Sequence, residues 1–331
     1  MPSSISSSDA SHVAEAPLRA KVPLWASFAL VGAIVVLLVV MELLARLMVP
    51  SLSRIEGRIV TEYRQALGIR HGRNGVATAL VIGNSLMGDG VDFKPLQRTL
   101  ADNGVNAQRL LVEGTAYLDW YHGLGRLIDA GVRPDAFVLM ISFEQLIGKE
   151  FRGAYSAHRL LRLQDIPTVA GELGLGNTET SGLVISRLSA YYGLREELRK
   201  QVLFKLIPDL STLTVKLTAA RSSDERARYG NVALAVERLT AMRRRVEAAG
   251  SRLIFVEPPA PVPNAAAMKE RIDAAARLAG VRMLVPVRHD ELGKEFYRDG
   301  YHLNERGSAF FTPRLAALLS ESMGQQPPLR N

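Results

Sequence analysis

The chain has 331 residues, no cysteine and a formal net charge of +8, from 41 Lys+Arg against 33 Asp+Glu. Hydrophobic residues make up 47% of the chain, which excludes a wholly disordered protein. The absence of cysteine excludes disulfide scaffolds, iron–sulfur centres and thiolate-ligated zinc sites, but it does not exclude a location outside the cytoplasm, because a chain this long can bury a core without disulfides.

The N-terminal part of the sequence predicts a membrane anchor. Residues 1–21 are rich in small polar side chains and are predicted to form a disordered tail. Residues 22–41 carry no charge, and a helix of that length, at about 1.5 Å per residue, spans a bilayer core. No convincing cleavage site follows, so a transmembrane anchor over residues 22–46 is favoured over a cleaved signal peptide or a buried core helix. Basic residues flank both ends of the run, so charge does not choose its orientation.

A juxtamembrane linker over residues 47–76 precedes an α/β pattern, and its residues 51–75 are predicted to form a helix followed by a glycine-containing stretch. Short apolar runs indicate five buried strands, at residues 79–82, 109–112, 136–141, 252–257 and 283–287. Helical spacing covers residues 93–103, 119–130, 231–249, 265–279 and the segment from residue 304 onward. Strands that alternate with helices predict one three-layer α/β/α domain with a five-stranded parallel sheet, over residues 77–324. Residues 325–331 are predicted to form a C-terminal tail.

A long insertion separates the third predicted strand from the fourth. It covers roughly residues 142–230, far more than an ordinary connection. Helical spacing recurs at residues 156–163 and 183–207, and residues 195–221 are basic and amphipathic. Two interpretations stay open: a helical cap over the sheet edge, or a lid, docking surface or membrane-lying helix near the anchor.

Two short motifs carry the residues suited to chemistry. Ser85 follows Gly83-Asn84 at the end of the first strand, where functional groups of a parallel sheet gather and a helix N-terminus stabilises negative charge. Asp299 precedes His302 by three residues across a glycine-containing turn, so its carboxylate can fold back onto an imidazole suited to general base work. Each motif alone also occurs as an ordinary turn.

Together these blocks resemble the SGNH (GDSL) hydrolase superfamily over roughly residues 77–322, apart from the long insertion, with Asn84 where many members have Asp. The resemblance implies that Ser85 is the nucleophile, His302 the base and Asp299 the acid that orients it. It also implies an oxyanion hole built from the backbone N–H groups of Ser85 and of Gly114, which follows the second strand.

The third block of the superfamily is not present in this chain. Where Gly-x-Asn-Asp is expected, the sequence reads Ser142-Phe-Glu144-Gln145. Loss of one oxyanion-hole donor typically costs about 2.7–4 kcal/mol of transition-state stabilisation, and Glu144 would repel the developing charge. We therefore expect either another donor, with Gln145 as the candidate, or slow hydrolysis. Further candidates for the cleft are Asn84 and His122, and His122 otherwise belongs to a helix face.

The layout of anchor and domain is similar to membrane-anchored acyltransferases of the bacterial envelope, of the kind acting in alginate O-acetylation and teichoic-acid D-alanylation. This implies a single-pass inner-membrane protein whose domain faces the periplasm and transfers a small acyl group to an envelope polysaccharide. A membrane-bound O-acyltransferase is the implied supplier of the acyl group. The alternatives are an esterase or deacylase, and a non-catalytic carbohydrate-binding or assembly component.

Other functional classes find little support in the sequence. No metal and no cofactor are expected, because no histidine has metal-ligand spacing with a second histidine. Residues 243–245 are three consecutive arginines, but no aromatic side chains accompany them, so a solvated helix face is favoured over nucleic-acid binding. The glycine-rich motif at Gly83 lacks the lysine of a phosphate-binding loop, which disfavours nucleotide binding.

Overall fold

The computed structural model describes residues 23–207, 232–259, 265–288 and 290–324. The chain divides into two compact units, residues 1–41 and residues 42–331. The predicted tails at residues 1–21 and 325–331 lie outside the described residues, as does the insertion from residue 208 to residue 230. Each unit is described below by itself.

The first unit consists, in its described part, of the apolar portion of α1 (Leu24–Leu52). Helix α1 is the one helix in the described ranges that is long and apolar enough to cross a membrane. Its side chains from Leu24 to Val40 are largely exposed. Exposed apolar side chains along a helix of this length are what a membrane anchor presents to lipid. The structure thus shows the long apolar N-terminal helix that the sequence predicts.

The second unit begins with the end of α1 and with α2 (Arg54–Leu67). Ser53 separates the two helices and caps α2, because its hydroxyl accepts a hydrogen bond from Glu56 N. Ala45, Val49 and Ile59 are buried in the same apolar cluster as the sheet. The segment predicted as a juxtamembrane linker is therefore mostly helical and packs on the domain.

The centre of the second unit is a parallel sheet of five strands, as predicted. The strands are β1 (Ala77–Gly83), β2 (Val105–Leu111), β3 (Ala136–Met140), β4 (Arg252–Val256) and β5 (Arg282–Leu284), in the order β2-β1-β3-β4-β5. All neighbouring strands run parallel. The order changes direction at β1, so the crevice of the sheet is expected outside the carboxyl ends of β1 and β3.

Two strands differ from their predicted bounds by three residues or more at one end, and the other three differ by one or two. Strand β2 begins at Val105 rather than at Arg109, because Ala77 of β1 pairs with Val105 and extends the ladder. As an edge strand with exposed Asn106, β2 lacks the continuous apolar run from which the prediction was made. Strand β5 ends at Leu284, two residues before Pro286, which cannot donate to a ladder.

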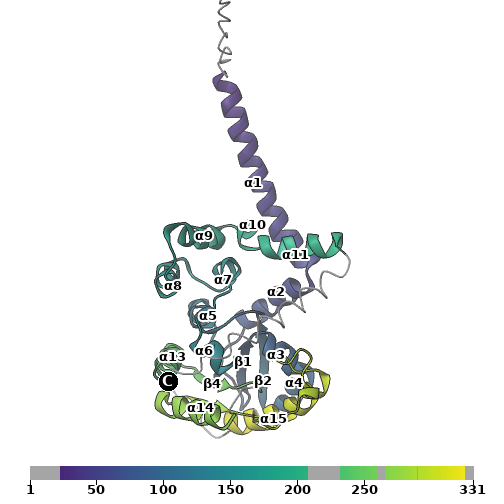
Figure 1. Ribbon diagram of the computed structural model, residues 1–331, viewed down its shortest axis with the longest axis vertical. Helices are drawn as coiled ribbons and strands as arrows, with labels where there is room; N and C mark the ends of the chain where they lie inside the picture. The colour runs from purple at the N-terminus through teal and green to yellow at the C-terminus, as the bar shows by residue number, and fades with distance from the viewer. Residues whose placement is uncertain (1–22, 208–231, 260–264, 289, 325–331) are drawn as a thin grey trace, which may run out of the picture. The chain divides into compact units, whose positions relative to one another are not determined.

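The sheet separates two apolar cores, because successive side chains of a strand point to opposite faces. Leu80 and Ile82 of β1 join the core that includes α5 (Tyr117–Asp129), α13 (Val232–Glu247) and α14 (Ala265–Ala279). Ala79 and Val81 join the core that includes α4 (Phe93–Asp102) and α15 (Glu305–Gly324). Figure 1 shows α13 and α4 on opposite sides of the strands. The predicted three-layer architecture is confirmed.

The described part of the insertion is helical. It forms α6 (Phe143–Ile147), α7 (Ala154–Arg159), a 3₁₀ turn at Leu163–Asp165, α8 (Ile166–Leu173), α9 (Asn177–Leu188), α10 (Ala190–Gly193) and α11 (Arg195–Leu206). The sequence predicts one helical stretch over residues 183–207, but the structure divides this stretch among α9, α10 and α11. Ser189 has an extended backbone, and its hydroxyl caps α10 by accepting from Tyr192 N, so the chain turns there. In Figure 1, α9, α10 and α11 lie in a row.

Candidate active site

The structure places Ser85 at the crevice of the sheet. It is the first residue of α3 (Ser85–Gly90), which begins directly after β1. Asn84 caps this helix, since its Oδ1 accepts a hydrogen bond from Leu86 N at 3.0 Å. Gly83 is required for the close approach of β1 and β3, because a Cβ there would lie 2.5 Å from Met140 O. The sharp strand-to-helix turn thus presents the Ser85 hydroxyl at the carboxyl edge.

A hydrogen-bonded turn brings Asp299 back onto His302. Asp299 Oδ1 accepts from the backbone N–H groups of Tyr301 at 3.0 Å and His302 at 2.8 Å. Gly300 takes a positive φ of 78°, which glycine adopts without the strain of a side chain. The turn leaves Asp299 Oδ2 free to accept from the imidazole. The three-residue spacing seen in the sequence therefore has the geometric consequence predicted for it.

The three predicted residues form one hydrogen-bonded series. Ser85 Oγ lies 3.0 Å from His302 Nε2, and His302 Nδ1 lies 2.8 Å from Asp299 Oδ2. Burial by itself raises the pKa of Asp299, but the hydrogen bonds from the His302 backbone and ring outweigh it, so the pKa lies below its ordinary value. Asp299 is thus held ionised beside the ring. Such an arrangement can deprotonate a serine and stabilise the imidazolium that forms.

Two backbone N–H groups are available as oxyanion donors. Neither Ser85 N nor Gly114 N donates a hydrogen bond to any part of the chain that the structure describes. Gly114 follows β2 with a positive φ of 67°, a conformation that favours glycine. Its loop is tied to the nucleophile turn, because Asn84 Nδ2 donates to Thr115 O at 2.7 Å. The position of Gly114 is consistent with the predicted role.

Asn84 also ties the third loop of the site to the nucleophile turn. Its Nδ2 donates to Gln145 Oε1 at 2.8 Å, and the same oxygen accepts from Ser142 N at 3.0 Å. Asn84 is fully buried, so both bonds are sheltered from water. With Gln145 Oε1 occupied twice, Gln145 Nε2 is the end of the amide that remains for a ligand, and it has no partner among residues 23–324 as described.

The site contains two ionisable residues that the sequence did not single out. Burial raises the pKa of Glu257 well above its usual range, although Phe143 N donates to it at 3.2 Å, and nearby Glu144 raises it further. Burial likewise raises the pKa of Tyr301, whose ring meets that of His302 edge-on with centroids 5.2 Å apart. Both groups favour their neutral forms. Their only signal in the sequence was position: Tyr301 adjoins His302, and Glu257 ends the fourth predicted strand.

His122 does not join this network. It lies on α5 with its side chain buried, and its Nδ1 is 3.3 Å from Asp165 Oδ1, which belongs to the 3₁₀ turn of the insertion. Of the two interpretations made from the sequence, the structure therefore gives a buried helix position. In the described ranges, no group of three or more His, Asp or Glu residues could hold a metal ion.

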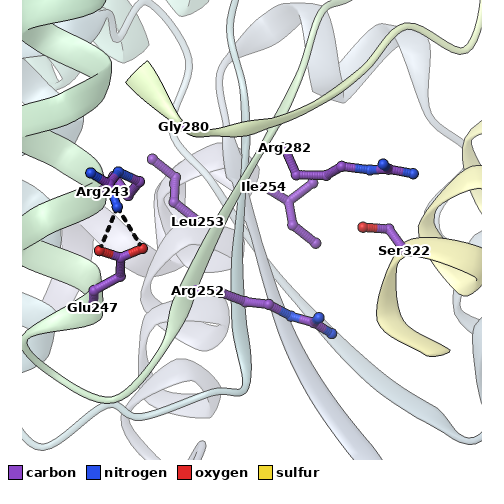
Figure 2. A pocket seen from close by; sticks show the side chains of 8 residues that line it. All are labelled: Arg243, Glu247, Arg252, Leu253, Ile254, Gly280, Arg282 and Ser322. Atoms are coloured by element: carbon purple, nitrogen blue, oxygen red, sulfur yellow. Dashed lines mark hydrogen bonds and ion pairs between the residues drawn. The ribbon is translucent and has the colours of Figure 1, made fainter. Parts of the chain in front are cut away.

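The described cavities lie away from the triad. Figure 2 shows a cavity of about 290 Å³ whose lining includes Arg252 and Arg282, the first residues of β4 and β5, and the ion pair between Arg243 and Glu247. Because Ser85 follows the carboxyl end of β1, this cavity belongs to the opposite edge of the parallel sheet. A second cavity, of about 260 Å³, is lined by residues of α2, β2, α5 and α7. Neither includes a triad residue.

The comparisons with known proteins concern the fold. No family model matches this chain, and no curated protein matches it. The chain is similar in structure to TesA, with 14% identity, a TM-score of 0.38, and 73% of this chain and 97% of TesA covered. It is also similar to LAE5, an alpha/beta hydrolase enzyme from the metagenome of Lake Arreo, Spain, with 12% identity, a TM-score of 0.39, and 78% and 99% covered. The chemistry inferred below therefore rests on the geometry of the site.

Proposed function

We propose that this protein is a serine-dependent O-acyltransferase, anchored in the inner membrane by α1, that transfers a small acyl group to a hydroxyl of an envelope polysaccharide. The observation that carries the proposal is the series of hydrogen bonds from Ser85 Oγ through His302 to Asp299. The apolar α1 supports the anchor. The resemblance of the Ser85 and His302 blocks to the SGNH superfamily agrees with the catalytic role of these residues.

The reaction proceeds through an acyl-serine intermediate. His302 Nε2 takes the proton of Ser85 Oγ as that oxygen bonds to the carbonyl carbon of the acyl donor. The carbonyl electrons move onto oxygen, and they return as the bond to the leaving group breaks and His302 gives that group its proton. An acceptor hydroxyl then repeats the cycle: its proton passes to His302, its oxygen bonds to the acyl carbon, and Ser85 regains the proton.

Each remaining residue of the site acts on one part of that cycle. Asp299 fixes the tautomer of His302 and stabilises the imidazolium, since its pKa is lowered and it stays ionised. The N–H groups of Ser85 and Gly114 face the developing oxyanion, and Gln145 Nε2 is the candidate for the donor that the absent Asn would supply. Water in place of the acceptor hydroxyl would make the same site an esterase.

The test is turnover of nitrophenyl acetate by the purified full-length chain, with and without an envelope glycan. We expect nitrophenol release that rises with the glycan and disappears in Ser85→Ala, while Ser181→Ala, at an exposed position of α9, behaves as the unmodified chain. Mass spectrometry should find the acyl group on the peptide that contains Ser85. Fast release that ignores the glycan would show an esterase instead.

A second experiment separates the catalytic proposal from a binding role. In cells that lack the protein, the unmodified chain should restore acyl groups on the envelope glycan, whereas Ser85→Ala should not. Full restoration by Ser85→Ala would refute catalysis and leave a non-catalytic assembly role. A phosphatase fused to the C-terminus should be active if the domain faces the periplasm, and an inactive fusion would contradict that location.

A further inference from the structure

The insertion carries an exposed apolar surface. Leu188 of α9 is 63% exposed and Leu206 of α11 is 71% exposed. Three further residues of the same two helices and their C-terminal flank are also exposed: Ile185, Val202 and Ile207. Helix α10 contacts both α9 and α11, so these side chains belong to one layer of the insertion. Large apolar side chains gathered in this way indicate a surface that something other than water covers.

Glu42 connects this layer to the end of the apolar run. It is the first charged residue after the uncharged residues 22–41. Its carboxylate accepts from Ser189 Oγ at 2.8 Å, from Ala190 N at 2.9 Å and from Tyr191 N at 3.1 Å, all at the start of α10. The insertion is therefore fixed, within residues 42–331, to the residue at which the membrane-spanning run ends.

The hydrogen bonds to Glu42 also remove the main obstacle to placing this region at a membrane. Arg46 Nε donates to Glu42 Oε1 at 2.7 Å, in addition to the three donors at the start of α10. A carboxylate whose acceptor sites are filled by protein donors loses far less on leaving water than a bare one. The contact is thus compatible with the boundary between headgroups and acyl chains, where water becomes scarce.

The apolar surface continues past Glu42 on α1 itself. Leu43, Leu44, Leu47 and Met48 are all exposed, although they follow the predicted end of the uncharged run. Ala45 and Val49 on the same two turns are buried in the domain core. One side of this segment therefore packs on the domain. The remaining side is exposed and apolar, apart from Arg46, which pairs with Glu42.

Basic residues accompany the apolar ones on α11. Arg199 and Lys200 are exposed on the helix that also carries Leu206, although Lys200 pairs with Glu197 at 3.1 Å and Glu196 is exposed as well. Apolar side chains beside lysine and arginine are the composition of helices that lie at the surface of anionic membranes. The exposed apolar side chains of α1 that follow the uncharged run, such as Leu43 and Leu47, favour lipid as the occupant.

We propose that α9 and α11 lie in the headgroup region of the bilayer that α1 crosses, so that lipid covers their exposed apolar side chains. This inference rests on the membrane anchor of the proposed function. It adds a second attachment, which holds the domain against the bilayer rather than leaving it on a single helix. The depth expected for such side chains is about 5–10 Å into the boundary between headgroups and acyl chains.

The absence of cysteine makes the test direct, because one introduced cysteine is the sole labelling site. Full-length Leu188→Cys, Leu206→Cys and Leu278→Cys are labelled with an environment-sensitive fluorophore and reconstituted into vesicles of phosphatidylcholine and phosphatidylglycerol. Leu278 of α14 is 72% exposed and is the matched control. Val35→Cys, in the apolar run, reports insertion of α1. Each labelled protein is first shown to keep the circular-dichroism spectrum of the unmodified chain.

We expect the labels at positions 188, 206 and 35 to shift to shorter wavelengths and to lose emission when the lipids carry bromine on the upper acyl chain, while the label at 278 does neither. If the labels at positions 188 and 206 behave as the label at 278 while the label at 35 is quenched, α1 is inserted but lipid does not cover the surface. The lipid inference is then overturned, and a protein partner becomes the occupant to test. If 35 is not quenched, the anchor itself fails. The catalytic proposal is tested separately by Ser85→Ala, so the failures are distinguishable.

Discussion

Replacement of Asn84 by aspartate tests how the site is assembled. Asn84 Nδ2 donates to Thr115 O at 2.7 Å and to Gln145 Oε1 at 2.8 Å, so one amide joins the loops after β1, β2 and β3. Asn84→Asp replaces that donor by an oxygen that faces two other oxygens in a fully buried position. The substitution keeps the volume and the cap to Leu86 N, and it introduces the residue that many members of the SGNH superfamily carry there.

The expected penalty can be worked from these contacts. Thr115 O loses its donor, whereas Gln145 Oε1 keeps the one it has in Ser142 N. A buried polar group left without a partner costs about 1–3 kcal/mol, so the free energy of unfolding should fall by roughly 1–3 kcal/mol. Rotation of the Gln145 amide would offer Nε2 to the new carboxylate, but Ser142 N would then lose the acceptor it has at 3.0 Å. Rotation therefore moves the loss to another group and does not remove it.

Activity should fall as well, because the loops that carry Gly114 and Gln145 lose their attachment to the nucleophile turn. A displacement that costs about 1.4 kcal/mol of transition-state stabilisation lowers kcat/KM tenfold, and we expect at least that. The assays are urea unfolding and nitrophenyl acetate turnover. Asn103→Asp is the matched control, since Asn103 is exposed and, within the described ranges, its Nδ2 donates to Thr99 O alone, at 2.7 Å.

The reasoning would be refuted if Asn84→Asp matched Asn103→Asp in both measurements. Exposed substitutions of this kind usually change the free energy of unfolding by less than about 0.5 kcal/mol, so the two variants should be well separated. A partial recovery of Asn84→Asp at acid pH would support the argument further, because a protonated carboxyl regains one donor.

Three further predictions concern single residues. Asp299→Asn should lower nitrophenyl acetate turnover by about a thousand- to ten-thousand-fold, as loss of the orienting carboxylate does in serine triads, and unchanged initial rates would contradict its role. Gly114→Ala forces a side chain onto a φ of 67°, at roughly 1–2 kcal/mol, and should lower kcat more than it raises KM in steady-state kinetics. Burial, with the Arg159 charge, lowers the pKa of His158 to about 4 from 6.5. As the pH falls, His158 therefore binds a proton in the unfolded chain before it does so in the folded chain. The free energy of unfolding should decline by on the order of 3 kcal/mol as the pH falls from 6.5 to 4. His158→Gln should remove that part of the decline in urea titrations, and an unaltered pH dependence would contradict the assignment.

Much of the sheet and the main chemical residues could be predicted from the sequence, because both depend on local pattern. Continuous apolar runs mark strands covered on both faces, as in β1 and β3. The edge strand β2 was predicted only in part, since three of its seven residues are not buried and its start is fixed by pairing with Ala77. The break at Ser189 was missed because a serine in a helical pattern shows its capping role only where its hydroxyl finds an N–H.

The sequence by itself determined the order of strands and helices, the apolar run before Glu42, and the residue types of the Ser85 and His302 blocks. The Asp299–His302 contact also belongs to this group, because three residues and a glycine turn bring the two side chains together locally. Only the tertiary structure decided which distant groups meet: Ser85 with His302 across the sheet edge, Asn84 with Gln145, and Glu42 with the start of α10. Such contacts join residues far apart along the chain, and no local spacing encodes them, since they follow from strand order and from the packing of the insertion.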